Sequence, residues 1–286
     1  MEINMKRIFT VVLIALLSCT IACAQGSGSK RPRHGGRSGH VGKGKKGASN
    51  GKSKYTPEIL RFVVEGVSFD MVEVRGGTFR MGATSEQGSD AESDEKPVHS
   101  VTLSSYYIGK TEVTQELWQA VMGNTTSDTI YNMPIVGVSW YDCQEFISQL
   151  NALTGLNFRL PTEAEWEFAC RGGNNSRGYK YSGSNYIDNV AWYWGNSDEE
   201  AHPVATKSPN ELGIYDMSGN VWEWCADWYG DYSSGAQTNP RGPLSGLLRV
   251  IRGGCWDYGV GGCRSSCRGS NNLAGRYISV GLRLAL

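Results

Sequence analysis

The sequence predicts a domain of mixed α/β type with low regular secondary structure. The chain has 286 residues and 40% hydrophobic content, which is enough for one large core. It contains 37 glycines but only nine prolines, together with nine tryptophans and 14 tyrosines, so many tight turns should surround an aromatic core. Short strand-like and helix-like segments also follow one another along the chain. This pattern favours an irregular mixed fold over a helix bundle.

Short strands are predicted at several places. The apolar residues of 71–74 and 79–81 flank Gly76 and Gly77, which is typical of a hairpin with a glycine turn. Further strands are expected at 98–103, 106–108, 248–252 and 278–286, and the last of these alternates well enough to close a sheet.

Three amphipathic helices have recognisable caps. The first is expected after Thr114 and should end at Gly123. The second should begin at a capping box of Ser139 with Asp142 and end at Gly155. The third should follow the stronger box of Thr162 with Glu165 and end before Gly172. We expect all three to pack on the core.

The first 24 residues are expected to be an export signal. Lys6 and Arg7 precede an apolar run at 8–17, which is too short to cross a membrane as a helix. Two kinds of processing are open. Cleavage after Ala24 would release a soluble protein, whereas the L-L-S-C sequence resembles a lipobox that would make Cys19 a lipid-modified N-terminus.

Residues 25–54 are predicted to be a basic, disordered tether that leads to a globular domain at 55–286. Segment 30–54 has nine Lys and Arg residues and no acid, whereas residues from 55 onward have 17 basic and 27 acidic residues. The tail could contact anionic lipid or polysaccharide, or it could be a solvated linker. Because the domain is acidic, we expect no binding to nucleic acid.

The segment 213–225, G-I-Y-D-M-S-G-N-V-W-E-W-C, is predicted to be a crowded turn around which the domain is organised. Its tryptophans need a core to enter, and Trp192 and Trp194 are expected to anchor the loop before it. Oxygen groups at close spacing suit a hard cation. The residues concerned are Asp216, Gly219, Val221 and Glu223. The alternative is a turn held only by buried indoles.

Several ordered motifs resemble one family, the sulfatase-modifying factors or formylglycine-generating enzymes. The matching segments cover roughly residues 65–286. They include G-G-T-F-R-M-G at 76–82, E-V-T-Q at 112–115, F-R-L-P-T-E-A-E-W-E-F-A at 158–169, P-N-E-L-G-I-Y-D-M-S-G-N-V-W-E-W at 209–224, R-V-I-R-G-G-C-W at 249–256 and G-L-R-L at 281–284. The resemblance implies the formylglycine-generating enzyme fold, which is related to the C-type lectin fold.

The resemblance also implies an oxidase whose copper is bound by a C-x4-C pair of cysteines. In the family, the second cysteine stands three residues before a retained arginine; counting back from Arg268 gives Ser265 and then Val260, and neither is cysteine. Cys263 and Cys267 are spaced C-x3-C instead. They are the weak catalytic candidates together with Trp222, which matches the family, as does Arg283. The alternative for Cys255, Cys263 and Cys267 is a structural disulfide or buried free thiols.

For calcium, the resemblance implies one site made by Asp216, Gly219, Val221 and Glu223. A second site would begin at Asn189 and Val190. We therefore expect structural calcium, and copper only if the protein is catalytic.

The combined expectation is an exported domain that binds or supports a partner, either an envelope protein or a sulfatase-like polypeptide. It would be periplasmic or held at the membrane through Cys19 or the basic tail. The alternative is a working formylglycine-generating oxidase. A related iron-dependent sulfoxide synthase is disfavoured, because the chain has only four histidines and two of them, His34 and His40, lie in the tether.

Overall fold

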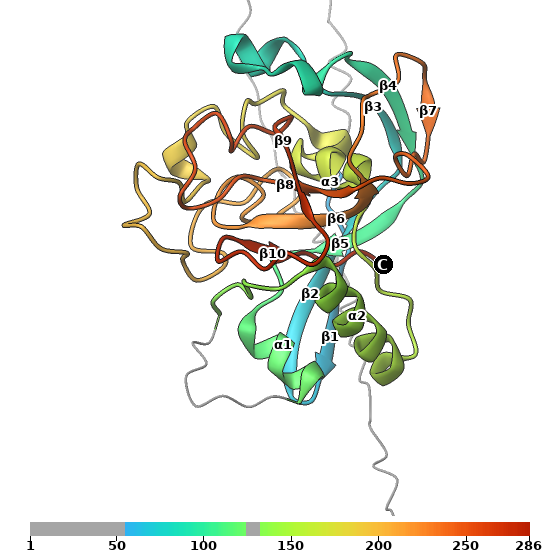
Figure 1. Ribbon diagram of the computed structural model, residues 1–286, viewed down its shortest axis with the longest axis vertical. Coiled ribbons are helices and arrows are strands. Elements are labelled where there is room, and N and C mark those ends of the chain that lie inside the picture. Colours follow the sequence, from blue (N-terminus) through green and yellow to red (C-terminus); the bar gives the residue numbers. More distant parts are fainter. Residues whose placement is uncertain (1–54, 124–131) are drawn as a thin grey trace, which may run out of the picture. The chain divides into compact units, whose positions relative to one another are not determined.

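The strands of the domain form three small sheets, and the computed structural model describes residues 55–123 and 132–286 (Figure 1). The first sheet has the order β1-β2-β5, the second β3-β4-β7 and the third β10-β6-β8-β9. Their bounds are β1 Ile59–Val64, β2 Val67–Val74, β3 Gly77–Met81, β4 His99–Leu103, β5 Tyr106–Gly109, β6 Trp222–Trp228, β7 Gln237–Thr238, β8 Leu248–Arg252, β9 Arg268–Asn272 and β10 Val280–Leu282. The expected export signal, Cys19 and the basic tether lie outside the described residues.

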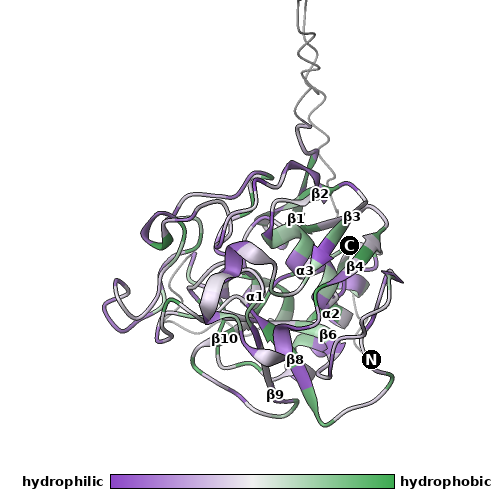
Figure 2. Cartoon of the chain, turned by 90° about the horizontal axis from the view of Figure 1, so that it is seen from above, coloured by the Kyte–Doolittle hydropathy of each residue, from purple (hydrophilic) through white to green (hydrophobic). Residues whose placement is uncertain are grey.

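The third sheet lies in the middle of the domain. In Figure 1, β1 and β2 lie below it with α1 and α2, and β3, β4 and β7 lie above it on the right. β10 pairs with β6 in parallel, whereas β6 with β8 and β8 with β9 are antiparallel. Hydrophobic segments lie mainly on the strands and helices in the middle of the domain, and hydrophilic ones mainly on the surrounding loops (Figure 2).

The three predicted helices are confirmed with their caps. α1 Gln115–Met122 begins with the Thr114 hydroxyl accepting the Leu117 amide and ends at left-handed Gly123. α2 Trp140–Thr154 and α3 Glu163–Cys170 both have the complete reciprocal capping box. These caps were predictable because each uses residues within one helical turn. Short 3-10 helices η1 Ser85–Asp90, η2 Ser93–Glu95, η3 Gly173–Asn175 and η4 Ile187–Asn189 lie in the loops.

The predicted hairpin at Gly76 and Gly77 is wrong. β2 and β3, which flank these glycines, belong to different sheets, and the hairpin instead joins β1 to β2 through Glu65 and Gly66, both with positive φ. A Cβ on Gly76 would lie 2.6 Å from the Leu103 carbonyl oxygen. The glycine therefore permits a close passage of two backbones and not a tight turn.

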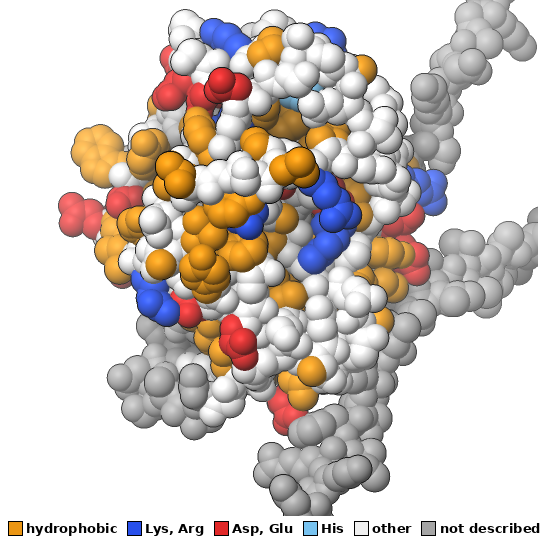
Figure 3. All heavy atoms as spheres, turned by 45° about the vertical axis from the view of Figure 1, so that its right-hand side comes forward, with side chains coloured by type: hydrophobic (Ala, Val, Ile, Leu, Met, Phe, Trp, Pro, Cys, Tyr) orange, Lys and Arg blue, Asp and Glu red, His pale blue; other side chains and the backbone are white. Residues whose placement is uncertain are grey.

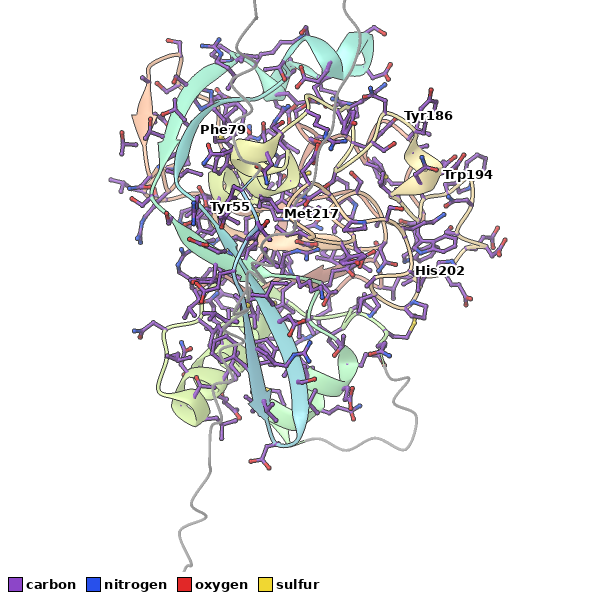
Figure 4. The ribbon with its side chains drawn as sticks, turned by 180° about the vertical axis from the view of Figure 1, so that it is seen from behind. Tyr55, Phe79, Tyr186, Trp194, His202 and Met217 are labelled. Carbon is purple, nitrogen blue, oxygen red and sulfur yellow. The ribbon has the colours of Figure 1, made fainter. Side chains whose placement is uncertain are left out.

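Three further expectations need correction. The second half of the crowded turn is strand β6, which is buried along most of its length and so shows no strand-like alternation. The strand expected at 278–286 is reduced to β10, followed by isolated bridges at Ala285. Trp194 is no anchor, since it is 72% exposed and protrudes with Tyr186 at the edge of the domain, whereas Met217 lies inside (Figure 4).

Candidate functional site

The turn that precedes β6 is made by residues in the left-handed conformation. Asp216, Gly219 and Asn220 have φ values of 59°, 76° and 62°. A Cβ on Gly219 would stand 2.1 Å from the Trp192 carbonyl oxygen, so only glycine fits there. The Asn220 side chain donates to Glu112 Oε2 at 3.0 Å and accepts from the His202 amide at 2.9 Å. The turn is thus attached to two distant segments.

Glu223, the last residue of the predicted calcium set, is held by two donors inside the core. Arg283 Nη2 donates to Glu223 Oε1 at 2.6 Å, and Arg283 Nε lies 2.9 Å from Oε2. Trp166 Nε1 donates to Oε2 at 2.6 Å. Glu223 and Arg283 are fully buried, so this bidentate pair joins β6 to the segment after β10.

Sequence reasoning missed Glu112 as part of this cluster. Its carboxylate is buried beside the turn, and burial together with Asp216 and Glu223 raises its pKa well above the ordinary glutamate value. Burial also raises the pKa of Asp216 to about 6. Glu112 opens the E-V-T-Q segment, and its place at the start of a motif shared with the family was the available signal. We call Glu112, Asp216, Glu223 and Arg283 the acid-rich cluster.

The acid-rich cluster fits a hard cation in charge and donor type, because three carboxylates face one guanidinium. Calcium there would neutralise the excess negative charge. The oxygens of Glu223 are engaged by Arg283 and Trp166, however, and no group of three or more acidic, His or Cys side chains within 55–123 and 132–286 has the arrangement of a metal site. At the predicted second site, the Asn189 carbonyl accepts the Ser208 amide, and Val190 is buried in a small apolar cluster.

The two cysteines of the C-x3-C pair face different surroundings. Cys263 packs with Tyr181 and Val190 in the small apolar cluster, whereas Cys267 belongs to the main core and reaches the surface groove described below. Burial raises the pKa of the Cys263 thiol to about 12 and that of Cys267 to about 11. All six cysteines of the described residues are free thiols, so the expected disulfide is not found and the buried-thiol alternative holds.

A groove of about 510 Å³ opens along β9 and the loop that precedes it. Trp222 and Tyr258 meet edge to face there, with ring centroids 5.5 Å apart. Gly259 and Gly261 have open space on the face where a Cβ would stand, so a ligand can approach the backbone closely there. The lining includes Glu92, Trp222, Asp257, Tyr258, Gly259, Gly261, Gly262, Cys267, Arg268, Gly269, Ser270, Asn271, Tyr277 and Ser279. Of the predicted catalytic candidates, the groove brings together Trp222 and Cys267 but not Cys263.

The small sheets, the long loops and the left-handed turn that leads into the tryptophan-rich strand β6 define a single mixed α/β domain of the formylglycine-generating enzyme type. The family model of the sulfatase-modifying factor enzyme 1-like domain matches residues 65–286, and the chain belongs to this family.

Curated relatives differ in their named roles. The chain is 34% identical to the chaperone protein LppX of Paenibacillus barcinonensis, over 76% of this chain and 89% of the relative. It is 29% identical to the formylglycine-generating enzyme of Streptomyces coelicolor, over 75% and 88%. It is also 33% identical to the serine/threonine-protein kinase pkn1 of Chlamydia caviae, of which it spans only 38%.

Solved structures agree on the fold. Treponema denticola variable protein 1 has a TM-score of 0.71 at 33% identity, covering 80% of this chain and 99% of the other. PvdO of Pseudomonas aeruginosa has a TM-score of 0.62 at 27% identity, covering 76% and 93%. The fold class expected from the sequence is confirmed.

Proposed function

We propose that this protein is an exported, envelope-associated domain that binds a polypeptide partner in the groove around Trp222 and Tyr258, and that it is not an oxidase. One observation carries the proposal: the groove is lined by aromatic rings and glycines, while Cys263 is buried outside it. A copper-binding pair needs two thiolates that converge on one ion.

The chemistry of the groove suits a polypeptide. Aromatic side chains at Trp222, Tyr258 and Tyr277 can pack against apolar or cationic side chains, and Gly259 and Gly261 leave the backbone accessible. Asp257 and Glu92 add negative charge, whereas Arg268 is already paired with Glu163. We therefore expect a partner segment that carries a basic residue.

Two further observations support a binding role. The relative LppX carries the name of a chaperone protein. The domain also exposes many large apolar side chains, and Figure 3 shows hydrophobic side chains gathered in the middle of one face with basic side chains beside them. Such patches are characteristic of interaction surfaces.

Site-specific photo-cross-linking tests the groove. A benzoyl-phenylalanine at Tyr258, which is 52% exposed, is expected to form an adduct with an envelope polypeptide in cells that express the full chain. The matched control carries the same group at Tyr186, which is 77% exposed and does not line the groove. An adduct of equal strength at both positions, or at neither, would contradict the proposal.

The second candidate function is the oxidase, which the similarity to the formylglycine-generating enzyme of Streptomyces coelicolor favours. Purified protein is incubated with copper and a C-x-P-x-R peptide, and aldehyde is sought by mass spectrometry, with that enzyme as the positive control. We expect no aldehyde. Turnover that disappears in the Cys267→Ser variant would establish the oxidase instead.

Export and anchoring are part of the proposal. In the described residues, no helix has the length and apolar character needed to cross a membrane. The proposed attachment is through a lipid on Cys19 or through the basic tail. Mass spectrometry of the mature N-terminus distinguishes a lipid-modified Cys19 from cleavage after Ala24, and an unprocessed Met1 would contradict export.

Calcium is the proposed structural cofactor of the acid-rich cluster. Its support is the excess of carboxylates over guanidinium groups in a buried site. The chelator experiment below tests it independently of the groove.

A further inference from the structure

A second cavity, of about 530 Å³, borders Arg268, which also lines the groove. It is open to solvent on one side and is lined by the start of α3, the ends of β3 and β6, strand β4 and the loop between β6 and β8. This loop carries β7 alongside β4 (Figure 1). Arg268 is its only lining residue in common with the groove. Its volume falls within the range of small-molecule sites, which is roughly 300–1,000 Å³.

Asp227 is buried at the cavity wall with one carboxylate oxygen unused. The residue is 4% exposed, and its Oδ2 accepts the Glu163 amide at 2.9 Å. Oδ1 accepts no hydrogen bond from any described residue and stands 3.1 Å from the position that a Cβ on Gly242 would occupy. Oδ1 is not one of the fully buried side-chain atoms that lack a partner, so it is reached from the cavity, and the donor of a ligand can bond to it there.

His99 presents a second acceptor to the same cavity. The residue is 2% exposed, and its Nδ1 lies 3.0 Å from the Pro97 carbonyl oxygen. Because a carbonyl can only accept, Nδ1 carries the proton, and in the neutral ring Nε2 is then an acceptor. Nε2 has no hydrogen-bond partner among the described residues, and the ring packs against Tyr232 with centroids 4.9 Å apart.

The buried donors around the cavity are already committed. Arg268 donates to both oxygens of Glu163, at 2.7 and 2.9 Å, and to the Asp94 carbonyl. The Tyr232 hydroxyl also lies within 3.1 Å of Glu163. The lining thus offers Asp227 and His99 as acceptors and apolar surface from Met81, Ala164 and Trp228. It also includes the polar side chains of Ser233, Gln237 and Thr238. Exposed Asp231 and Arg241 lie at the rim.

We propose that this cavity is a second ligand site, which binds a small molecule with an ammonium head group on a compact apolar body. The ammonium group would donate to Asp227 Oδ1 and His99 Nε2, and the apolar body would pack against Met81 and Trp228. The site is separate from the groove, so it stands whether or not the groove binds a polypeptide.

The test uses the full chain with benzylammonium as the probe, observed through the methionine methyl resonances. The Met81 methyl is expected to shift saturably, while that of Met217, which does not line the cavity, stays in place. Benzyl methyl ether, which has a similar body but no donor, is expected to leave Met81 unmoved. Equal shifts with both compounds, or none with either, would overturn the proposal.

Two variants locate the binding. Asp227→Asn is expected to weaken benzylammonium roughly tenfold or more, the loss associated with one charge-assisted hydrogen bond. Asp70→Asn, which removes a carboxylate outside the cavity, should bind like the parent. If Asp227→Asn does not fold, Ser233→Trp at the exposed rim fills the cavity and should also abolish the Met81 shift. Parent-like affinity in whichever of the two variants folds would refute the site.

The pH profile is a further readout. Burial and Glu163 raise the pKa of Asp227 to about 7, Glu165 adds to this, and Arg249 opposes it. The other charged or titratable groups that line the cavity are His99, Glu163, Asp231, Arg241 and Arg268, and Arg268 is paired with Glu163. Benzylammonium should therefore bind more tightly at pH 8 than at pH 6, because the carboxylate is then ionised. The pH dependence should become weaker in Asp227→Asn, and a profile identical to that of the parent would contradict the role of Asp227.

Discussion

Two buried clusters of charge in this domain are built on different plans. In one, Glu95, Glu163 and Glu167 pair with Arg264, Arg268 and Arg252, joining η2 and α3 to β8, β9 and the loop between them. We call it the paired cluster. In the acid-rich cluster, Arg283 alone faces Glu112, Asp216 and Glu223. The paired cluster has one guanidinium for each carboxylate, whereas the acid-rich cluster has three carboxylates for one guanidinium.

The largest effect is expected from breaking the paired cluster. Arg264 donates to Glu95 at 2.7 and 2.5 Å, and both side chains are almost fully buried. Arg264→Ala should lower the free energy of unfolding in urea by about 3–5 kcal/mol, because Glu95 is left buried and unpaired.

The double variant Arg264→Met with Glu95→Leu is the control. It should recover most of the lost stability, since two apolar side chains leave no charge to satisfy. A double variant as unstable as the single one would show that packing, and not charge, holds this cluster together.

Calcium removal should have the next largest effect. If calcium completes the acid-rich cluster, a chelator should lower the melting temperature, by the equivalent of about 2.7 kcal/mol when free calcium had been a hundredfold above its Kd. Asp216→Asn and Glu223→Ala should each remove the sensitivity to chelator. If the chelator does not change the melting temperature, the alternative holds that the turn is stabilised only by buried indoles.

A smaller effect is expected from Glu112 when chelator is present. Because its pKa is raised in the folded state, folding binds a proton, and stability is lost as pH rises above the ordinary glutamate pKa of about 4.3. Glu112→Gln lacks this titration, so its melting temperature should fall less than that of the parent between pH 5 and pH 8. If the melting temperatures of the parent and of Glu112→Gln fall by the same amount, a group other than Glu112 takes up the proton on folding.

The smallest effect should come from an exposed pair that belongs to neither cluster. Arg61 lies 2.7 Å from Asp70, but its side chain is 51% exposed. Arg61→Met should change the free energy of unfolding by less than about 1 kcal/mol. A loss as large as that of Arg264→Ala would mean that burial does not explain the difference between pairs.

Whether a structural feature could be predicted from the sequence depended on how far apart its interacting residues lie along the chain. The helix caps at Thr114, Ser139 and Thr162 were predictable, because their partners lie three residues away. The division of strands among sheets was not, because nothing local in 74–77 distinguishes a hairpin from a passage between sheets. Strand β6 was not predicted for a related reason, because burial on both faces removes the alternation of apolar and polar residues that marks a strand.

The candidate sites follow the same rule. Spacing alone indicated that the cysteine pair is displaced, but it could not place Cys263 and Cys267 in different clusters. Glu112 meets Asn220 across 108 residues, and Arg264 meets Glu95 across 169. Such contacts form only when the fold brings distant segments together, so they cannot be predicted from local patterns in a single sequence.

The late position of β10 has a consequence for biosynthesis. β10 Val280–Leu282 covers one edge of β6, and the adjoining residues bond to Tyr107 and Arg159. A ribosome that has not yet reached this segment carries a chain whose central strand has an open edge. The domain therefore completes its fold only after β10 has been synthesised. Until then, the open edge of β6 must be kept from pairing with strands of other chains.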